Sequence, residues 1–132
     1  MSNEFYGSKG FYYFAHPYSC LNKQDQQSLS GLNANFKLCN YRASELIRLG
    51  YNVFSPISHS HPIQMANAEL CKMSGTEEGK LWYSIDNQII ERANFDGIIL
   101  APGWQKSKGC IAEKLLFLSM GKEVLSYSNL VV

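Results

Sequence analysis

A turn of small and polar residues, Ser107-Lys108-Gly109, precedes Glu113 on a helix predicted to follow it. Backbone N–H groups in such a turn can face an anion such as a phosphate, and the positive end of the helix dipole adds attraction. Gly109 would allow the ligand to come close to the backbone. Ser107 as an N-cap and Glu113 as an early helical acid could instead serve the helix alone. Their spacing is too long for a capping box, which favours a binding role.

Two further residues could act with that glutamate. Asp86 follows Trp82 by four residues, so the two share one face of a predicted helix. Asp86 is either a solvent-facing helical acid or a group that acts on a ligand. Tyr13 lies within a predicted strand and by pattern alone belongs to the core. Its position near the carboxyl end of that strand would also let its hydroxyl orient a carboxylate.

The histidines and tryptophans offer binding groups more readily than a metal site. His59 and His61 form an H-x-H pair, which in an extended segment would place both imidazoles on one side. A zinc site needs further ligands, and none is evident in the pattern, so we expect no metal and no cofactor. Lining a pocket or hydrogen bonding is the favoured role of this pair. A base could stack on Trp82 or Trp104, although ordinary packing explains both equally well.

Short apolar runs alternate with helical patterns along the chain. Strands are predicted over 11–15, 51–54, 95–102 and 124–127, and helices over 35–50, 81–93 and 111–120. The polar stretch 19–34 is predicted to be a long connection or lid. Residues 57–79 give an unclear pattern with a few helical turns. The apolar tail 130–132 is expected to pack on the domain or to extend an edge of the sheet.

This alternation predicts one domain over 1–132, a small doubly wound (flavodoxin-like) α/β fold. We expect a parallel sheet of four or five strands with helices on both faces. Ligands of such sheets bind beyond the carboxyl ends of the strands. Those ends carry residues 16–19, including His16, residues 55–61 and residues 101–109, so the most unusual residues gather at one predicted edge.

Composition narrows the classes of partner. The formal net charge of +1 argues against a dedicated binder of nucleic-acid polymers. No apolar run approaches the ~20 residues that span a bilayer, and residues 1–10 have no signal-peptide core. The four cysteines are scattered without a C-x-x-C pair, which indicates reduced thiols. We therefore expect a cytoplasmic protein that does not bind membranes.

These pieces, in this order, resemble the nucleoside 2-deoxyribosyltransferase superfamily, which includes 2'-deoxynucleoside 5'-phosphate N-hydrolase-like proteins. The resemblance covers about residues 12–127. It rests on Tyr13-Phe14-Ala15-His16-Pro17-Tyr18, Arg42-Ala43, residues 50–56, Trp82, Asp86, residues 96–100, Pro102-Gly103-Trp104, Ser107, Gly109, Glu113 and residues 121–124. Each piece is weak alone, and the ordered set is more specific.

The resemblance implies cleavage of the N-glycosidic bond, or base exchange, on a (deoxy)nucleoside or its 5'-monophosphate. Glu113 would be the nucleophile, Asp86 would assist the departing base and Tyr13 would hold Glu113. Ser107 would bind a 5'-phosphate, and the family is usually oligomeric, so a homodimer or homotetramer is expected. The remaining substrate-binding candidates are Gly109, His16, Trp104, His59 and His61. The alternative is a non-catalytic protein that sequesters a nucleotide or an ADP-ribose-like ligand.

Overall fold

The computed structural model describes residues 7–132, in which four strands form one parallel sheet in the order β2-β1-β3-β4. The strands are β1 (Phe11–Ala15), β2 (Asn52–Phe54), β3 (Gly97–Leu100) and β4 (Glu123–Ser126). This arrangement confirms the predicted doubly wound fold, and each strand falls within a residue or two of its predicted place. The prediction for residues 1–10 lies mostly outside the described residues.

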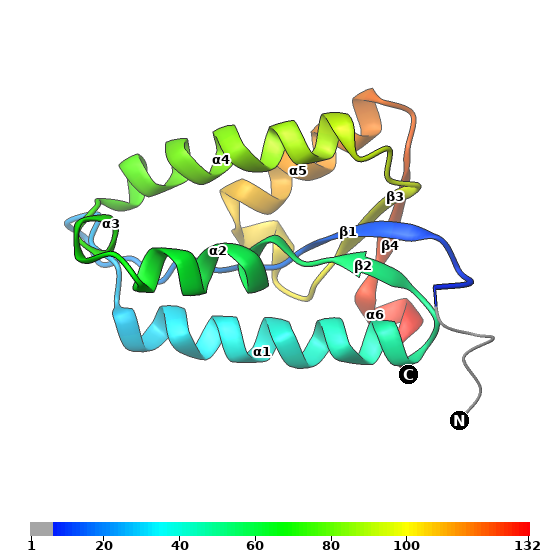
Figure 1. The fold of residues 1–132 in the computed structure, drawn as a ribbon, viewed down its shortest axis with the longest axis horizontal. Coiled ribbons are helices and arrows are strands. Elements are labelled where there is room, and N and C mark those ends of the chain that lie inside the picture. Colours follow the sequence, from blue (N-terminus) through cyan, green and yellow to red (C-terminus); the bar gives the residue numbers. More distant parts are fainter. Residues whose placement is uncertain (1–6) are drawn as a thin grey trace.

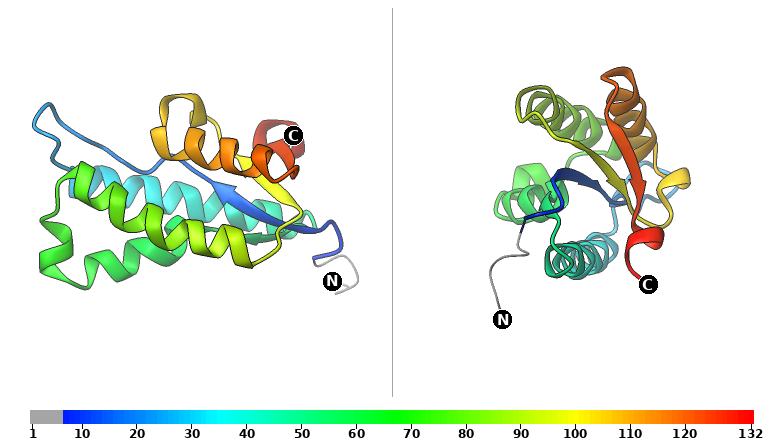
Figure 2. Two further views of the ribbon diagram at one scale, coloured as in Figure 1. Left: turned by 90° about the horizontal axis from the view of Figure 1, so that it is seen from above. Right: turned by 90° about the vertical axis from the view of Figure 1, so that its right-hand side faces the viewer.

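Helices cover both faces of the sheet (Figures 1 and 2). Their bounds are α1 (Leu29–Arg48), α2 (Pro56–Met65), α3 (Ala68–Cys71), α4 (Gly75–Arg92), α5 (Lys108–Ser119) and α6 (Tyr127–Leu130). The right-hand view of Figure 2 shows α4 and α5 on one side of the strands and α1 and α6 on the other. Segments far apart in the chain therefore meet above each face.

Alternation of side chains along β1 divides the core into two layers. Tyr12 and Phe14 pack with α1 on one face, whereas Tyr13 and Ala15 pack with residues of α4 and α5 on the other. Successive strand residues point to opposite faces, so this division follows from the register of β1. The direction of Tyr13 toward α4 and α5 is what brings it to the site described below.

The structure corrects two expectations about the connections. Part of the stretch 19–34, predicted to lack regular structure, is helical because α1 begins at Leu29 and the side chain of Ser28 caps it by accepting from the backbone N–H of Gly31. The H-x-H pair lies in a helix rather than in an extended segment, because residues 56–65 form α2, with Pro56 at its start, where proline fits a helix. A polar helix start and a proline-led helix carry little apolar periodicity, which is why the pattern missed them.

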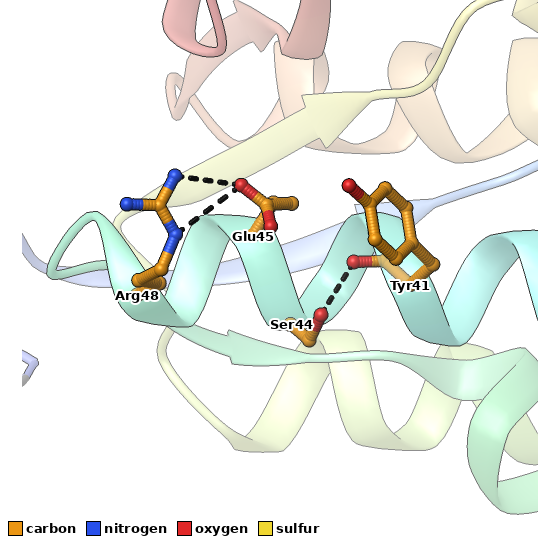
Figure 3. A network of polar contacts seen from close by, with 4 residues as sticks. All are labelled: Tyr41, Ser44, Glu45 and Arg48. Atoms are coloured by element: carbon orange, nitrogen blue, oxygen red, sulfur yellow. Dashed lines mark hydrogen bonds and ion pairs between the residues drawn. The ribbon is translucent and has the colours of Figure 1, made fainter.

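Polar contacts within α1 join residues three apart near the end of the helix. Arg48 forms an ion pair with Glu45 at 2.7 Å, and Ser44 Oγ donates to the carbonyl oxygen of Tyr41 (Figure 3). Exposed pairs of this kind contribute little to stability. At the other end of the chain, Leu130 and Val131 pack against the core on the α1 side, as predicted for the tail.

Gly97 is the glycine on which the pairing of β3 with β4 depends. A Cβ added there would overlap the carbonyl oxygen of Glu123, its partner in the sheet register. We expect Gly97→Ala to lower the free energy of unfolding by about 1–3 kcal/mol, because the two strands must separate to admit a methyl group. Urea denaturation measures this change.

Gly79→Ala is the matched control. Gly79 lies inside α4 with open space around its Cβ position, so alanine should stabilise the helix by about 0.5–1 kcal/mol. Equal stability of the two variants would show that the close approach at Gly97 does not constrain the sheet.

Candidate active site

Three ionisable side chains from three elements meet at the α4–α5 face of the sheet. The hydroxyl of Tyr13, in β1, donates a hydrogen bond to Glu113 Oε2, in α5. Asp86, in α4, is close enough to this pair for its negative charge to raise the pKa values of both Glu113 and Tyr13. Positions 13, 86 and 113 are distant in the chain and come together only because β1, α4 and α5 are packed in one layer.

Close packing holds the tyrosine ring at this position. Tyr13 is fully buried, and its ring centroid lies 5.6 Å from that of Phe95 and 5.7 Å from that of Phe117. A ring fixed on two sides has little freedom to turn. The hydroxyl of Tyr13 therefore presents a fixed donor to Glu113.

Burial dominates the electrostatics of the two acids. It raises the pKa of Glu113 to about 8, with a further increase from the negative charge of Asp86 and an opposing decrease from the Tyr13 hydrogen bond. Burial also raises the pKa of Asp86 to about 6. Two acids that repel one another in a poorly solvated site titrate as a pair, and near neutral pH this pair holds a single proton. The pKa of Tyr13 is well above its ordinary value, because of burial and both carboxylates, so the phenol remains a donor.

A cavity of about 890 Å³ opens beside these acids, and Asp86 and Glu113 both line it. Its walls include residues that follow the carboxyl ends of three strands: His16–Ser19 after β1, Pro56 and Ile57 after β2, and Gly103 and Lys106–Cys110 after β3. The cavity therefore lies at the edge that the sequence predicted. Its volume suits a small organic ligand of nucleotide size.

The Ser107–Gly109 turn combines capping with a place in the cavity wall. Ser107 Oγ accepts a hydrogen bond from the backbone N–H of Cys110 at 3.2 Å and so caps α5. Ser107, Lys108 and Gly109 also line the cavity, together with Lys106. Two lysines and the start of a helix bring positive charge to this part of the cavity, where the carboxylate of Asp25 lies near Lys108. An anionic group on a ligand would be favoured there.

His16 lines the cavity, but both of its ring nitrogens are occupied by the protein. Nδ1 donates to the carbonyl oxygen of Pro17 at 2.8 Å, and Nε2 accepts from the guanidinium of Arg42 at 3.0 Å. Burial, together with the charge of Arg42, lowers the pKa of His16. The ring is thereby held neutral in one tautomer, and what it offers a ligand is its surface rather than a free nitrogen.

The other predicted binding residues lie away from the cavity wall. Helical α2 turns His59 and His61 to different sides, since residues two apart on a helix do not share a face. His59 is exposed, whereas His61 is buried, stacks on Phe36 and contacts the hydroxyl of Tyr18 through Nδ1 at 2.5 Å. His61 thus supports Tyr18, which does line the cavity.

The two tryptophans also have different positions. Trp82 lines the cavity, and its indole N–H donates to Gln64 Oε1 at 2.7 Å. Trp104 packs against the core layer beneath α5, with Lys114 Nζ 4.5 Å from its ring centroid. Of the two stacking surfaces predicted from the sequence, Trp82 is the one that reaches the cavity.

Sequence reasoning missed a polar cluster in the cavity wall near the start of α4. Glu78 is buried in its wall and accepts hydrogen bonds from Gln27 and Gln64. A signal for it existed, because Glu78, Trp82 and Asp86 are spaced four residues apart and must share one face of a helix. Gln27 and Gln64 carry no comparable signal, since they come from a loop and from a helix that the pattern left unassigned.

Comparison with known families places the chain in one of them. Residues 10–129 match the family described as a domain of unknown function (DUF1937). The chain belongs to the DUF1937 family. No curated protein matches it significantly. The family match runs from β1 into α6, so it includes Tyr13, Asp86 and Glu113 of the site.

None of the helices within residues 7–132 is both long and apolar enough to cross a membrane. Over the same residues, no group of three or more His, Cys, Asp or Glu side chains has an arrangement that could hold a metal ion. The four cysteines are all free thiols, of which Cys20 is exposed.

The raised pKa of Glu113 predicts a pH-dependent stability cost. The pKa of Glu113 is higher in the folded protein than in the unfolded chain, so the unfolded chain releases this proton at lower pH. The free energy of unfolding therefore falls as pH rises from the ordinary glutamate value of 4.5 through about 8. Glu113→Gln removes the ionisation but keeps the shape. We expect this variant to melt several degrees above the parent at about pH 8.5 and close to it at about pH 5.

Thermal melting at the two pH values measures the effect, since about 1 kcal/mol changes the Tm of a domain of this size by roughly 3–5 °C. Glu91→Gln, at an exposed position on α4, is the control and should leave the pH dependence unchanged. An equal shift of Tm at both pH values would contradict the burial of an ionised Glu113.

Proposed function

We propose that this member of the DUF1937 family breaks the N-glycosidic bond of a (deoxy)nucleoside or its 5'-monophosphate, with Glu113 as the nucleophile. The observation that carries the proposal is the hydrogen bond from a rigidly packed Tyr13 to Glu113, in a cavity that Asp86 also lines. The resemblance of the ordered motifs to the nucleoside 2-deoxyribosyltransferase superfamily supports it. The same chemistry serves hydrolysis and base exchange, which differ only in the final acceptor.

The proposed reaction has two steps. In the first, a Glu113 carboxylate oxygen bonds to the anomeric carbon while the bond from that carbon to the base nitrogen breaks. The bonding pair leaves with the base, and the proton of the acid pair, delivered through Asp86, neutralises it. In the second, water or another base attacks the anomeric carbon and gives its proton to the Asp86 carboxylate, while the ester to Glu113 breaks and both acids return to their starting state.

The shared proton makes the two acids complementary. Glu113 must be ionised to attack, whereas the departing base needs a proton donor. Between about pH 6 and pH 8 the pair holds one proton, and the higher pKa of Glu113 places it mainly on that residue. The reactive microstate, with Glu113 ionised and the proton on Asp86, is the minor one, and it supplies both requirements at once. Tyr13 raises its share, since the hydroxyl stabilises the carboxylate of Glu113.

The positive end of the cavity supports a 5'-monophosphate as part of the substrate. Lys106 and Lys108 line the cavity with Ser107 at the start of α5, where an anion is favoured. This end is supplied by the loop after β3, a few residues before Glu113 in the chain. A sugar held at Glu113 would therefore have its 5' end directed to the start of the same helix.

We also propose an oligomeric state and a cellular compartment for this protein. Ile111, Leu115 and Leu118 form an exposed apolar stripe along α5, with exposed fractions of 37%, 59% and 50%, which supports a homodimer or homotetramer. Four free cysteines, one of them exposed, support a reducing compartment such as the cytoplasm.

Removal of the nucleophile tests the proposed function. We expect Glu113→Gln to reduce base release from 2'-deoxynucleoside 5'-monophosphates by at least ~10³-fold, because no covalent intermediate can form. Chromatography of released base measures the rate, and Glu91→Gln is the control that should keep full activity. Undiminished release by Glu113→Gln would disprove the mechanism. Tight binding of intact nucleotide without turnover by the parent protein would instead favour the sequestering alternative.

The acid pair predicts a bell-shaped pH profile. We expect kcat/KM to rise with pH through about 6 and to fall through about 8, because only the singly protonated pair is active. Tyr13→Phe should move the alkaline limb to higher pH and lower the rate at neutral pH by about 10- to 100-fold, since the carboxylate loses its donor. Initial rates across about pH 5–9 measure both. A flat profile would contradict the shared proton.

A further inference from the structure

A second buried carboxyl group faces the same cavity at a distance from the acid pair. Glu78 is only 4% exposed and lies in the cavity wall. Among residues 7–132 it takes part in neither of the two ion pairs, which join Arg48 to Glu45 and Lys72 to Glu69. Burial raises its pKa, and its two amide partners lower it. A buried carboxyl group without a cation is costly, so its place beside a cavity calls for an explanation.

Three neighbouring side chains fix the direction of this carboxyl group. Gln27 Nε2 donates to Glu78 Oε1 at 2.9 Å, and Gln64 Nε2 donates to Glu78 Oε2 at 2.7 Å. Gln64, itself 1% exposed, is held in turn by the indole N–H of Trp82 at 2.7 Å. Each carboxylate oxygen accepts one of these bonds and keeps a second lone pair. Glu78 is thereby a rigid, acceptor-only group with unused capacity.

The spacing along α4 relates this group to the reaction centre. Glu78, Trp82 and Asp86 all line the cavity from one face of the helix. Glu78 and Asp86 are eight residues apart, or about 12 Å along the axis. The two carboxyl groups therefore line different stretches of the cavity wall, between which the flat ring of a base could lie. The indole of Trp82 lies between the two acids, where it could pack on such a ring.

We propose that Glu78 is the specificity-determining residue for the base, and that it selects a purine with adjacent N–H donors on its edge remote from the sugar. This inference rests on the proposed function for the location of the sugar at Glu113. Guanine has the required edge, with the ring N1–H beside the exocyclic amino group. A carboxylate accepts from both donors, as in other bidentate contacts between side chains and bases.

Adenine would be rejected at the same place. Its corresponding edge carries one amino donor beside an unprotonated ring nitrogen, whose lone pair would face a carboxylate oxygen. Hypoxanthine keeps the ring N–H but lacks the amino group, so it should bind with intermediate affinity. The order guanine, hypoxanthine, adenine therefore distinguishes reading by Glu78 from mere filling of the cavity.

Binding to a variant that cannot react separates this inference from the proposed function. In Glu113→Gln we expect 2'-deoxyguanosine 5'-monophosphate to bind about 10- to 100-fold more tightly than 2'-deoxyadenosine 5'-monophosphate, with the inosine nucleotide between them. Isothermal titration calorimetry measures the three affinities. Equal affinities, or failure to bind any of the three, would overturn the role of Glu78. Selective binding by a protein whose parent cleaves none of them would leave that role intact and refute the proposed function alone.

Adding Glu78→Gln to this background tests the residue itself. The amide keeps the shape but replaces one acceptor with a donor, so the preference for the guanine nucleotide should fall to about threefold or less. If Glu78 only held Gln27 and Gln64 in place, its replacement would weaken the binding of all three nucleotides alike. The ratios of the three affinities would then stay unchanged, which would disprove the proposal. Glu91→Gln in the same background is the control and should leave the ratios unchanged. If Glu78→Gln fails to fold, the guanine-to-inosine ratio in Glu113→Gln alone decides.

Discussion

Burial of two carboxyl groups beside one fixed phenol is the constraint from which the rest of the site follows. Glu113 and Asp86 both have raised pKa values because the packing of α4 and α5 on the sheet removes water from them. Tyr13 limits that cost, since its hydroxyl stabilises the carboxylate form of Glu113. A pair of acids that would each be ionised in water thus shares one proton near neutral pH, and the group that attacks can coexist with a group that donates.

The fold makes this constraint possible through the alternation of side chains in β1. Tyr12 and Phe14 anchor the strand to α1, so Tyr13 must point to the opposite layer, where α4 and α5 bring the acids. Phe95 and Phe117 then close around the tyrosine ring. A shift of β1 by one residue would exchange the two faces and place Phe14 where the donor is needed. The register of one central strand therefore decides whether the site exists.

The cavity brings several chemistries together. Lysines at the start of α5, the acid pair, Trp82 and the buried Glu78 all line it. An anion, a sugar and a flat polar ring, the parts of a nucleotide, would each find a suitable group there. Membership of the DUF1937 family gives no activity by its description, so this set of groups is what supports the proposed substrate.

The amino-acid pattern by itself determined the four strands, their parallel arrangement and the edge at which polar residues gather, because apolar runs, glycines and prolines act locally. It also singled out Tyr13, Asp86 and Glu113. Tertiary structure alone decided which candidates meet. Helical α2 separates His59 from His61, Arg42 occupies the free nitrogen of His16, and Gln27 and Gln64 reach Glu78 from distant segments. These outcomes depend on packing between elements, which cannot be derived from residue types and their spacing in the sequence.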